Sequence, residues 1–405
     1  MTLRPLVAAL LILLTSVAVP TTAQESTNPM PDYRIVGYYP SWVIYGREYF
    51  VTDIPAAMLT HINYAFANIS DAGEITLGDE WADTQFPYPG DDEDAPLKGN
   101  FRQLQLLKDA NPHLQTLISV GGWTWSGKFS DVALTAESRE RFARSCVEFM
   151  LRYGFDGVDI DWEYPTGGGL AGNFERPEDK DNFILLLAEL RDQLDAQGER
   201  DGRRFLLTIA LGAGRSAYAL LAWGRIHPLL DWINVMTYDM SGAWSAVTGF
   251  NAPLYNSAVN SPEVNSADTT LRDLLALGIP ADKLVMGAPF YGRGWSGVQA
   301  ENDGLHQSFT GLPQGTWAEG SFDYGDLAAN YVGTFERFWH EAAQVPWLYD
   351  AARQIMITYD DPQSIALKAA YVREHVLGGI MFWELSGDDD SSSLLTGIYR
   401  TLNAP

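Results

Sequence analysis

The chain of 405 residues is 46% hydrophobic and 12% aromatic, which is enough to bury a core and excludes global disorder. Its 52 acidic and 27 basic side chains give a net charge of −25 at neutral pH. So acidic a surface repels phosphate backbones and anionic lipid, and we therefore expect no nucleic-acid and no membrane partner. The net charge is compatible with a neutral or cationic substrate. The alternative is that the acidic residues serve only to keep the protein soluble.

Residues 1–23 have the pattern of a secretory signal peptide. Arg4 precedes an almost wholly apolar run from Leu6 to Val19, and small residues follow at 21–23, where a signal peptidase would cut. No other run approaches the roughly 18 apolar residues of a membrane span. We expect a secreted, extracellular protein, and we expect it to be a monomer.

From residue 33 onward, short apolar runs alternate with amphipathic segments. Eight runs have strand character: 34–39, 61–67, 116–121, 157–160, 205–211, 232–238, 284–290 and 379–383. Five segments have helical spacing: 100–110, 135–153, 179–196, 267–277 and 362–375. Gly154 and Gly198 mark the ends of two of these helices, and Asp361 before Pro362 marks the start of another.

Eight strands that alternate with helices predict a parallel sheet of the α/β class, closed into a (β/α)8 TIM barrel. A doubly wound open sheet is the alternative, but the glycine-rich nucleotide fingerprint that accompanies it is missing. One connection is too long for a βα unit of about 30 to 40 residues, since the seventh run ends at Phe290 and the eighth begins at Gly379. The excess, residues 292–358, is expected to form a small α+β insertion domain in a barrel made of residues 33–291 and 359–403.

The fourth run leads into a row of acidic side chains. Because side chains alternate along a strand, Asp159, Asp161 and Glu163 share one face, while Trp162 points the other way, toward a helix. In a barrel this row would rise toward the C-terminal rim, where active sites lie. Like charges at this spacing favour a retained proton, so one carboxyl is expected to act as a general acid at neutral pH.

A metal site and a solvated acidic edge are the alternatives for this row. The six histidines show no HExxH or paired spacing, and apolar residues separate the acids, which disfavours both. We expect no metal and no cofactor. The single cysteine, Cys146, is interpreted as a small buried hydrophobe, because one thiol forms neither an intrachain disulfide nor a cysteine-based zinc site. The acidic stretch 91–94 is interpreted as a solvated loop, with cation binding as the alternative.

The acidic row also carries a family resemblance. The spacing of four acids resembles the DxxDxDxE signature of family 18 glycoside hydrolases, the chitinases. These acids are Asp156, Asp159, Asp161 and Glu163. The resemblance extends over essentially the whole chain after the signal peptide: residues 119–122 (SVGG) resemble the SxGG motif, residues 236–239 (MTYD) the MxYD motif, and Trp383 the active-site tryptophan. The insertion resembles the α+β domain of chitinases with a deep, tunnel-like cleft.

The resemblance implies a retaining, substrate-assisted mechanism that departs from the usual two-carboxylate scheme. Glu163 would protonate the glycosidic oxygen while the substrate's own 2-acetamido carbonyl attacks the anomeric carbon to form an oxazolinium. Asp161 would orient the acetamido N–H, and Asp159 would share its proton. Tyr238 would hydrogen-bond the acetamido oxygen, and Asp239 would contact the sugar at the scission site. Asp156 is expected only to make a supporting hydrogen bond.

The 13 tryptophans suit a sugar groove, since pyranose rings pack their C–H faces on aromatic planes, although most aromatic residues serve the core. Trp383 would lie beneath the sugar whose bond is cleaved. The other residues expected to bind substrate are Tyr38, Phe66, Ser119, Trp123, Tyr164, Met236, Trp244, Tyr291 and Arg293. For Ser119 and Met236, core filling is the alternative.

What the resemblance implies is a secreted chitinase that hydrolyses β-1,4 bonds between N-acetylglucosamine units, with chitin or chitooligosaccharides as its partner. Two alternatives stay open: an endo-β-N-acetylglucosaminidase acting on N-glycans or peptidoglycan, and a chitin-binding lectin without activity. The insertion and the aromatic residues favour a linear polymer. A lectin would lack the proton donor, whereas Glu163 is present together with Asp161 and Tyr238.

Overall fold

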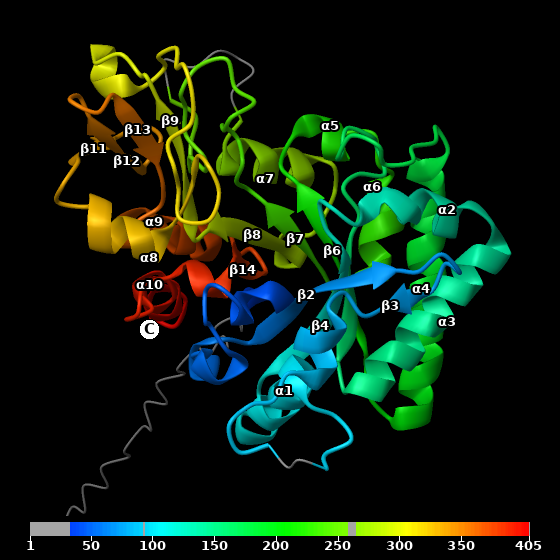
Figure 1. Cartoon of the computed structure of the whole chain (residues 1–405). Helices are drawn as coiled ribbons and strands as arrows, with labels where there is room; N and C mark the ends of the chain where they lie inside the picture. The colour runs from blue at the N-terminus through cyan, green and yellow to red at the C-terminus, as the bar shows by residue number, and fades with distance from the viewer. Residues whose placement is uncertain (1–32, 92–93, 258–264, 405) are drawn as a thin grey trace, which may run out of the picture. The chain divides into compact units, whose positions relative to one another are not determined.

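Eight parallel strands close into a barrel in the computed structural model, which describes residues 33–91, 94–257 and 265–404 (Figure 1). The barrel strands are β1 (Arg34–Pro40), β2 (His61–Ile69), β4 (Gln115–Gly121), β5 (Gly157–Asp161), β6 (Leu206–Gly212), β7 (Trp232–Met236), β8 (Leu284–Pro289) and β14 (Gly379–Trp383). Each pairs with the next, and β1 pairs with both β2 and β14, which closes the ring. The predicted (β/α)8 barrel and its eight strands are confirmed. The predicted signal peptide lies outside the described residues.

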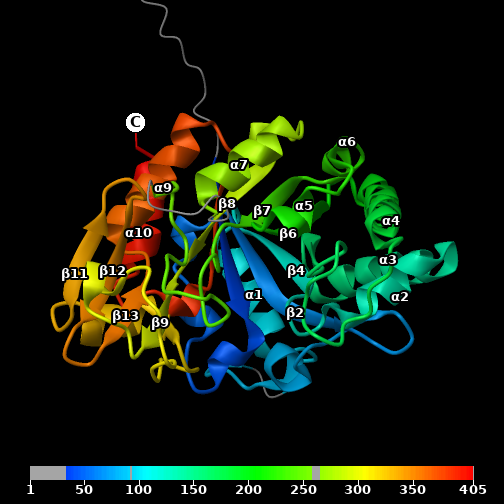
Figure 2. The same cartoon turned by 90° about the horizontal axis from the view of Figure 1, so that it is seen from above.

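The helices surround this barrel (Figure 2). Those predicted are α1 (Gly99–Ala110), α3 (Ala136–Tyr153), α4 (Asp179–Asp201), α7 (Ala267–Ala276) and α9 (Pro362–Glu374). The structure adds α2 (Phe129–Leu134), α5 (Arg215–Tyr218), α6 (Trp223–Ile226) and α10 (Ser393–Leu402). Two predicted end signals are confirmed: Gly154 ends α3 with a φ of 79°, and the Asp361 carboxylate accepts hydrogen bonds from the first backbone N–H groups of α9.

The predicted end of the third predicted helix, residues 179–196, at Gly198 is wrong. Helix α4 continues to Asp201 and ends at Gly202, which has a φ of 67°. Gly198 lies in the last turn, where the chain folds back over it: Arg203 N–H donates to its carbonyl at 3.1 Å. A Cβ atom on Gly198 would lie 2.3 Å from the Arg203 carbonyl oxygen. Close backbone approach, and not the helix cap, is therefore what requires this glycine.

The core has two layers that the barrel wall separates. Between strands and helices, Trp162 packs against Phe129 and Phe183 at ring distances of 5.4 and 5.7 Å, which confirms that it faces the helices. Cys146 is fully buried in this layer, as expected, and is a free thiol. Inside the barrel, a smaller apolar cluster surrounds Trp232 and Met381. Polar side chains are buried in the same interior, and several of them belong to the site described below.

A second sheet occupies most of the long connection between β8 and β14 (Figure 1). Its order is β10-β9-β13-β12-β11, formed by β9 (Tyr291–Ser296), β10 (Ser321–Asp323), β11 (Glu336–His340), β12 (Val345–Asp350) and β13 (Ile355–Thr358), and all its pairings are antiparallel. The sheet has its own apolar cluster around Trp295 and Trp347. The described chain from Tyr33 onward nevertheless forms one compact unit, so the division into barrel and insertion domain stays a prediction.

No helix of the described residues is long and apolar enough to cross a membrane.

Candidate active site

The acidic row lies at the C-terminal end of β5. Strand β5 ends at Asp161, and Glu163 follows two residues later. All three carboxyls are buried, with 0% of Asp159, 4% of Asp161 and 8% of Glu163 exposed. Exposure thus increases slightly from the barrel interior toward the rim. A buried carboxyl must be hydrogen-bonded, paired or protonated, and each member of the row meets this requirement differently.

Asp159 is held inside the barrel by donors from four strands. Its carboxylate accepts hydrogen bonds from Tyr38 on β1 and Ser119 on β4, both at 2.8 Å, and from Thr208 on β6 and Asn234 on β7, at 2.5 and 3.3 Å. Burial raises the pKa of Asp159, and these hydrogen bonds oppose the rise.

Ser119 and Tyr38 stand among the residues expected to bind substrate, but their hydroxyls donate to Asp159, and only 0% and 2% of these side chains is exposed. Their geometry supports a role in fixing Asp159. Thr208 and Asn234 were not identified from the sequence. Each is a single polar residue at an inward position of an otherwise apolar strand, which is the only local signal for it.

Asp161 has a carboxylate oxygen without a partner. Its Oδ1 atom is buried and makes no hydrogen bond to any described residue. Burial, followed by the nearby charges of Glu163 and Asp159, holds the pKa of Asp161 well above its ordinary value. A buried polar atom without a partner is unfavourable, so this oxygen is available to a ligand that brings a hydrogen-bond donor.

Glu163 has the properties of a general acid. Burial raises its pKa to about 7; the charge of Asp239 acts in the same direction, and a hydrogen bond from Tyr164 opposes it. The ring of Tyr164 packs on Gly212 at the end of β6, where a Cβ atom would lie 2.7 Å from it. A carboxyl with a pKa near 7 retains its proton often enough at neutral pH to donate it.

Tyr238 follows β7 and lies among the acids. Burial, Tyr291 and then the carboxylates of Asp161, Asp239 and Glu163 hold the pKa of its hydroxyl well above the ordinary value. The hydroxyl also lies 3.9 Å from the Met381 sulfur inside the barrel. Met236, the last residue of β7, is partly buried against the same interior cluster. Tyr238 thus presents a neutral donor next to Asp161 and Glu163.

The second sheet contributes two side chains to this rim. The Asp239 carboxylate accepts hydrogen bonds from Tyr291 at 2.9 Å and from Arg293 at 2.6 Å, and both donors belong to β9. The Arg293 guanidinium also lies 5.4 Å from the centre of the Trp244 ring, which is 61% exposed. Asn251, missed from the sequence, accepts the Asp239 backbone N–H at 3.0 Å.

An aromatic group lies around Trp383 at the end of β14. Its ring centre is 5.7 Å from those of Tyr38 and Phe66, the latter nearly parallel, and 6.2 Å from that of Trp42. The register between β2 and β4 shifts between Ala65 and Ala67, which takes Phe66 out of the regular ladder. Trp42, not identified from the sequence, follows β1 as Trp123 follows β4, and the two are 40% and 47% exposed.

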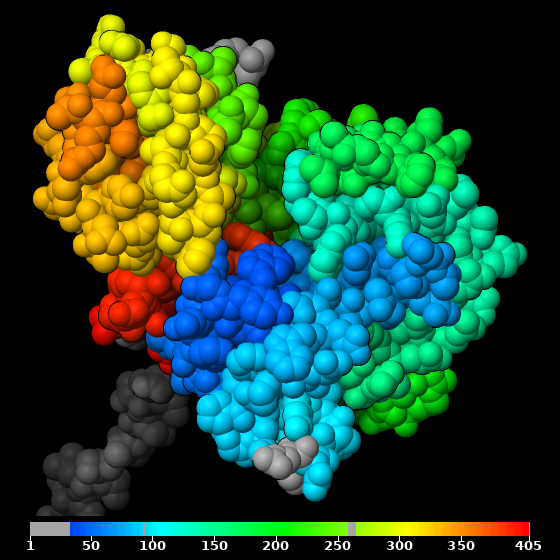
Figure 3. Space-filling view, viewed as in Figure 1, coloured from blue at the N-terminus to red at the C-terminus, as the bar shows by residue number. Residues whose placement is uncertain are grey.

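The surface is hollowed between the second sheet, in yellow, and the helical side of the barrel, in green and cyan (Figure 3). The rim residues therefore come from elements on both sides of a depression.

No three His, Cys, Asp or Glu side chains within residues 33–91, 94–257 and 265–404 are arranged to hold a metal ion. Asp156 makes the predicted supporting hydrogen bond: it accepts the Thr116 backbone N–H at 2.9 Å and pairs with Lys108 at 2.5 Å.

Comparison with known proteins gives one consistent family. The model of glycosyl hydrolases family 18 matches residues 34–388. Chitinase A1 of Niallia circulans is 48% identical over 93% of this chain, which spans only 60% of that relative's length. Endochitinase 1 of Metarhizium robertsii is 38% identical over 89% of this chain and 82% of its own.

Solved structures agree with these sequence relatives. Chitinase ChiA74 from Bacillus thuringiensis superposes with a TM-score of 0.87 at 42% identity, covering 91% of this chain and 69% of that one. The Ostrinia furnacalis group IV chitinase, solved in complex with allosamidin, has a TM-score of 0.81 at 31% identity and covers 91% of this chain and 98% of its own.

Proposed function

Because this chain belongs to glycosyl hydrolases family 18, we propose that it is a secreted chitinase that cleaves β-1,4 bonds between N-acetylglucosamine units. The observation that carries the proposal is the pair of acids at the end of β5. Glu163 is buried with a pKa of about 7, and Asp161 beside it has a buried carboxylate oxygen with no hydrogen-bond partner among the described residues. One acid can donate a proton, and the other offers an acceptor to a substrate N–H.

The mechanism that this arrangement supports is retaining and substrate-assisted. Protonated Glu163 gives its proton to the glycosidic oxygen as the bond to the anomeric carbon breaks. The substrate's 2-acetamido oxygen attacks that carbon and forms an oxazolinium ion. Asp161 accepts the acetamido N–H and stabilises the positive charge, while Tyr238 donates to the acetamido oxygen. Ionised Glu163 then removes a proton from the water that opens the ring, so that configuration is retained.

Asp159 serves this step from inside the barrel. Its raised pKa and its closeness to Asp161 allow the two carboxyls to share a proton as charge develops on the substrate. The four donors to Asp159 hold it in place for this exchange. We assign to Tyr38 and Ser119 this positioning role, in addition to any contact with sugar.

Substrate recognition is assigned to the two sides of the hollow. Trp383 and exposed Trp42, packed against buried Tyr38 and Phe66, offer aromatic planes to pyranose rings, and exposed Trp123 and Trp244 extend this surface. Asp239, Tyr291 and Arg293 supply polar contacts where the second sheet meets the barrel rim. The proposed ligand is chitin or a chitooligosaccharide. Secretion rests on the pattern of residues 1–23.

Replacement of the proposed acid tests the function. Glu163→Gln removes the proton donor and keeps the shape, so kcat on a chitin hexamer should fall roughly a hundred- to ten-thousand-fold. Binding of the hexamer, measured by calorimetry, should persist. Glu336→Gln on the exposed face of β11 is the matched control and should leave kcat unchanged. Near-wild-type turnover by Glu163→Gln would overturn the assignment.

A further inference from the structure

Ser126 joins the segment after β4 to the catalytic end of β5. It is the first residue of a short 3-10 helix, Ser126–Lys128, and only 1% of its side chain is exposed. Its hydroxyl oxygen accepts the Glu163 backbone N–H at 2.8 Å. The same hydroxyl lies 2.9 Å from the Gly122 carbonyl and 3.1 Å from the Asp161 carbonyl, to which it can donate.

These hydrogen bonds take the place of the strand pairing of β5, which ends just before Glu163. The pairing of β4 with β5 stops at Gly121 and Asp161, and that of β5 with β6 stops at Ile160, so the Glu163 N–H has no strand partner. Ser126 bonds to the backbone on both sides of residue 162. The Asp161 carbonyl also accepts the Gly122 N–H at 2.8 Å. One buried hydroxyl thus contacts the backbone of both acids and is the hydrogen-bond partner of the Glu163 N–H.

We propose that Ser126 is a positioning residue whose hydroxyl fixes the backbone that directs the Glu163 carboxyl toward the leaving oxygen. The inference rests on the proposed function, because it needs Glu163 to be the acid. Without the hydroxyl, the buried Glu163 N–H loses its partner, and the segment relaxes to recover a hydrogen bond. The carboxyl then spends less time in the geometry required for proton transfer.

A misplaced acid has a chemical signature. Proton donation matters most when the leaving group is a sugar alcohol, which is a poor leaving group unless protonated. It matters little when the leaving group is a nitrophenol, which departs as a stable anion. Ser126→Ala should therefore lower kcat on a chitin hexamer about ten- to hundredfold, but lower kcat on a 4-nitrophenyl chitobioside only a few-fold, with KM nearly unchanged for both. Ser126→Thr, which keeps the hydroxyl, should restore most of the loss.

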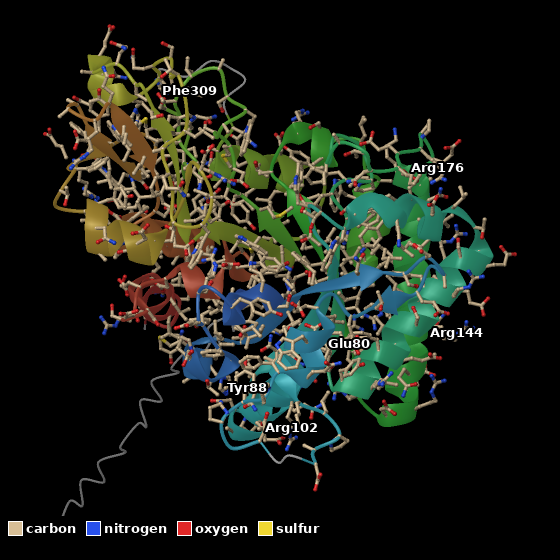
Figure 4. The ribbon with its side chains drawn as sticks, viewed as in Figure 1. Glu80, Tyr88, Arg102, Arg144, Arg176 and Phe309 are labelled. Atoms are coloured by element: carbon tan, nitrogen blue, oxygen red, sulfur yellow. The ribbon has the colours of Figure 1, made fainter. Side chains whose placement is uncertain are left out.

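Ser130 provides the matched control. It lies on α2, four residues further along the same segment, is fully buried, donates to Asp179 at 2.8 Å and accepts from Arg176 at 2.6 Å. Arg176, labelled in Figure 4, lies on the helical side of the molecule. Ser130→Ala removes an equally buried hydroxyl that does not contact the acid, so it should change the two substrates equally.

Equal losses on both substrates for Ser126→Ala, or no loss, would overturn the inference while the proposed function stood. Near-wild-type cleavage of the hexamer by Glu163→Gln would instead overturn the proposed function itself. If Ser126→Ala fails to fold, Ser126→Cys is measured in its place. Its thiol is a weaker donor and acceptor, and it should show the same selective loss on the hexamer, to a smaller degree.

Discussion

At the scale of single residues, the protonation of Glu163 depends on its neighbours. Its pKa of about 7 arises from burial first and from the Asp239 charge in addition. An acid that must be protonated loses activity as the pH rises through its pKa. We therefore expect the alkaline limb of the kcat/KM profile on a chitin hexamer to fall near pH 7.

Asp239→Asn tests this electrostatic account. The substitution removes a negative charge that favours protonated Glu163 and also leaves the Arg293 charge uncompensated, so both changes lower the Glu163 pKa. The alkaline limb should move to lower pH, whatever activity remains. Asp350→Asn, on β12 and hydrogen-bonded to Arg353, is the control and should not move it. A limb that stays in place or moves upward in Asp239→Asn would contradict the account.

The acidic row was predictable from the sequence because strand alternation alone puts Asp159, Asp161 and Glu163 on one face. Several of the groups that hold the row were not. Thr208 and Asn234 lie 49 and 75 residues from Asp159 along the chain, and only closure of the barrel brings them to it. Ser126 is similar: a serine after a glycine-rich turn has no local pattern that distinguishes it from solvated serines.

At the scale of elements, periodicity predicted where strands and helices lie, but it did not predict where some of them end. The sixth run was predicted to reach Tyr238, but β7 ends at Met236, because the Thr237 N–H turns back to the Val235 carbonyl at 2.8 Å. Helix α4 runs past Gly198 and ends only at Gly202, which adopts the left-handed conformation. From the sequence alone, a glycine inside a helix cannot be distinguished from a glycine that ends one. The distinction requires knowing which backbone packs against it.

The α4 end gives a stability prediction. A Gly to Ala change inside a helix normally stabilises it by about 0.5 to 1 kcal/mol. At Gly198 the new Cβ would meet the Arg203 carbonyl oxygen, so Gly198→Ala should instead lower the free energy of unfolding by about 1 kcal/mol or more, measured by urea denaturation. Gly224→Ala in α6, where nothing lies within 4 Å of the new atom, is the control and should be neutral or stabilising. A stabilised Gly198→Ala would show that the close approach is not rigid.

At the scale of the whole molecule, a buried ion pair lies where the chain returns from the second sheet to the barrel. Lys368 on α9 and Asp360, which follows β13, are 2.5 Å apart, with 0% and 1% of their side chains exposed. Burial lowers the pKa of Lys368 and raises that of Asp360, and each partner opposes this shift in the other. The length of the connection between β8 and β14 predicted an insertion. Neither the strand order of the second sheet nor this ion pair could be predicted from the sequence.

Lys368→Met should lower the free energy of unfolding by about 3 to 5 kcal/mol, because it leaves the Asp360 carboxylate buried without its partner. The double variant Lys368→Met with Asp360→Asn should recover most of that loss, since no charge is then left buried. Urea denaturation of the two variants and the wild type measures the difference. A double variant no more stable than the single one would contradict the explanation.

The central claim is that this chain cleaves chitin with help from the substrate's own acetamido group. The most direct measurement is the time course of products from a chitin hexamer, with the anomers resolved, with and without an inhibitor that mimics the oxazolinium ion. The account predicts that the newly formed ends are β-anomers and that the inhibitor binds tightly. Products that appear first as α-anomers would contradict the retaining mechanism. A hexamer that is bound but not cleaved would contradict chitinase activity and would favour a lectin or an enzyme that acts on N-glycans.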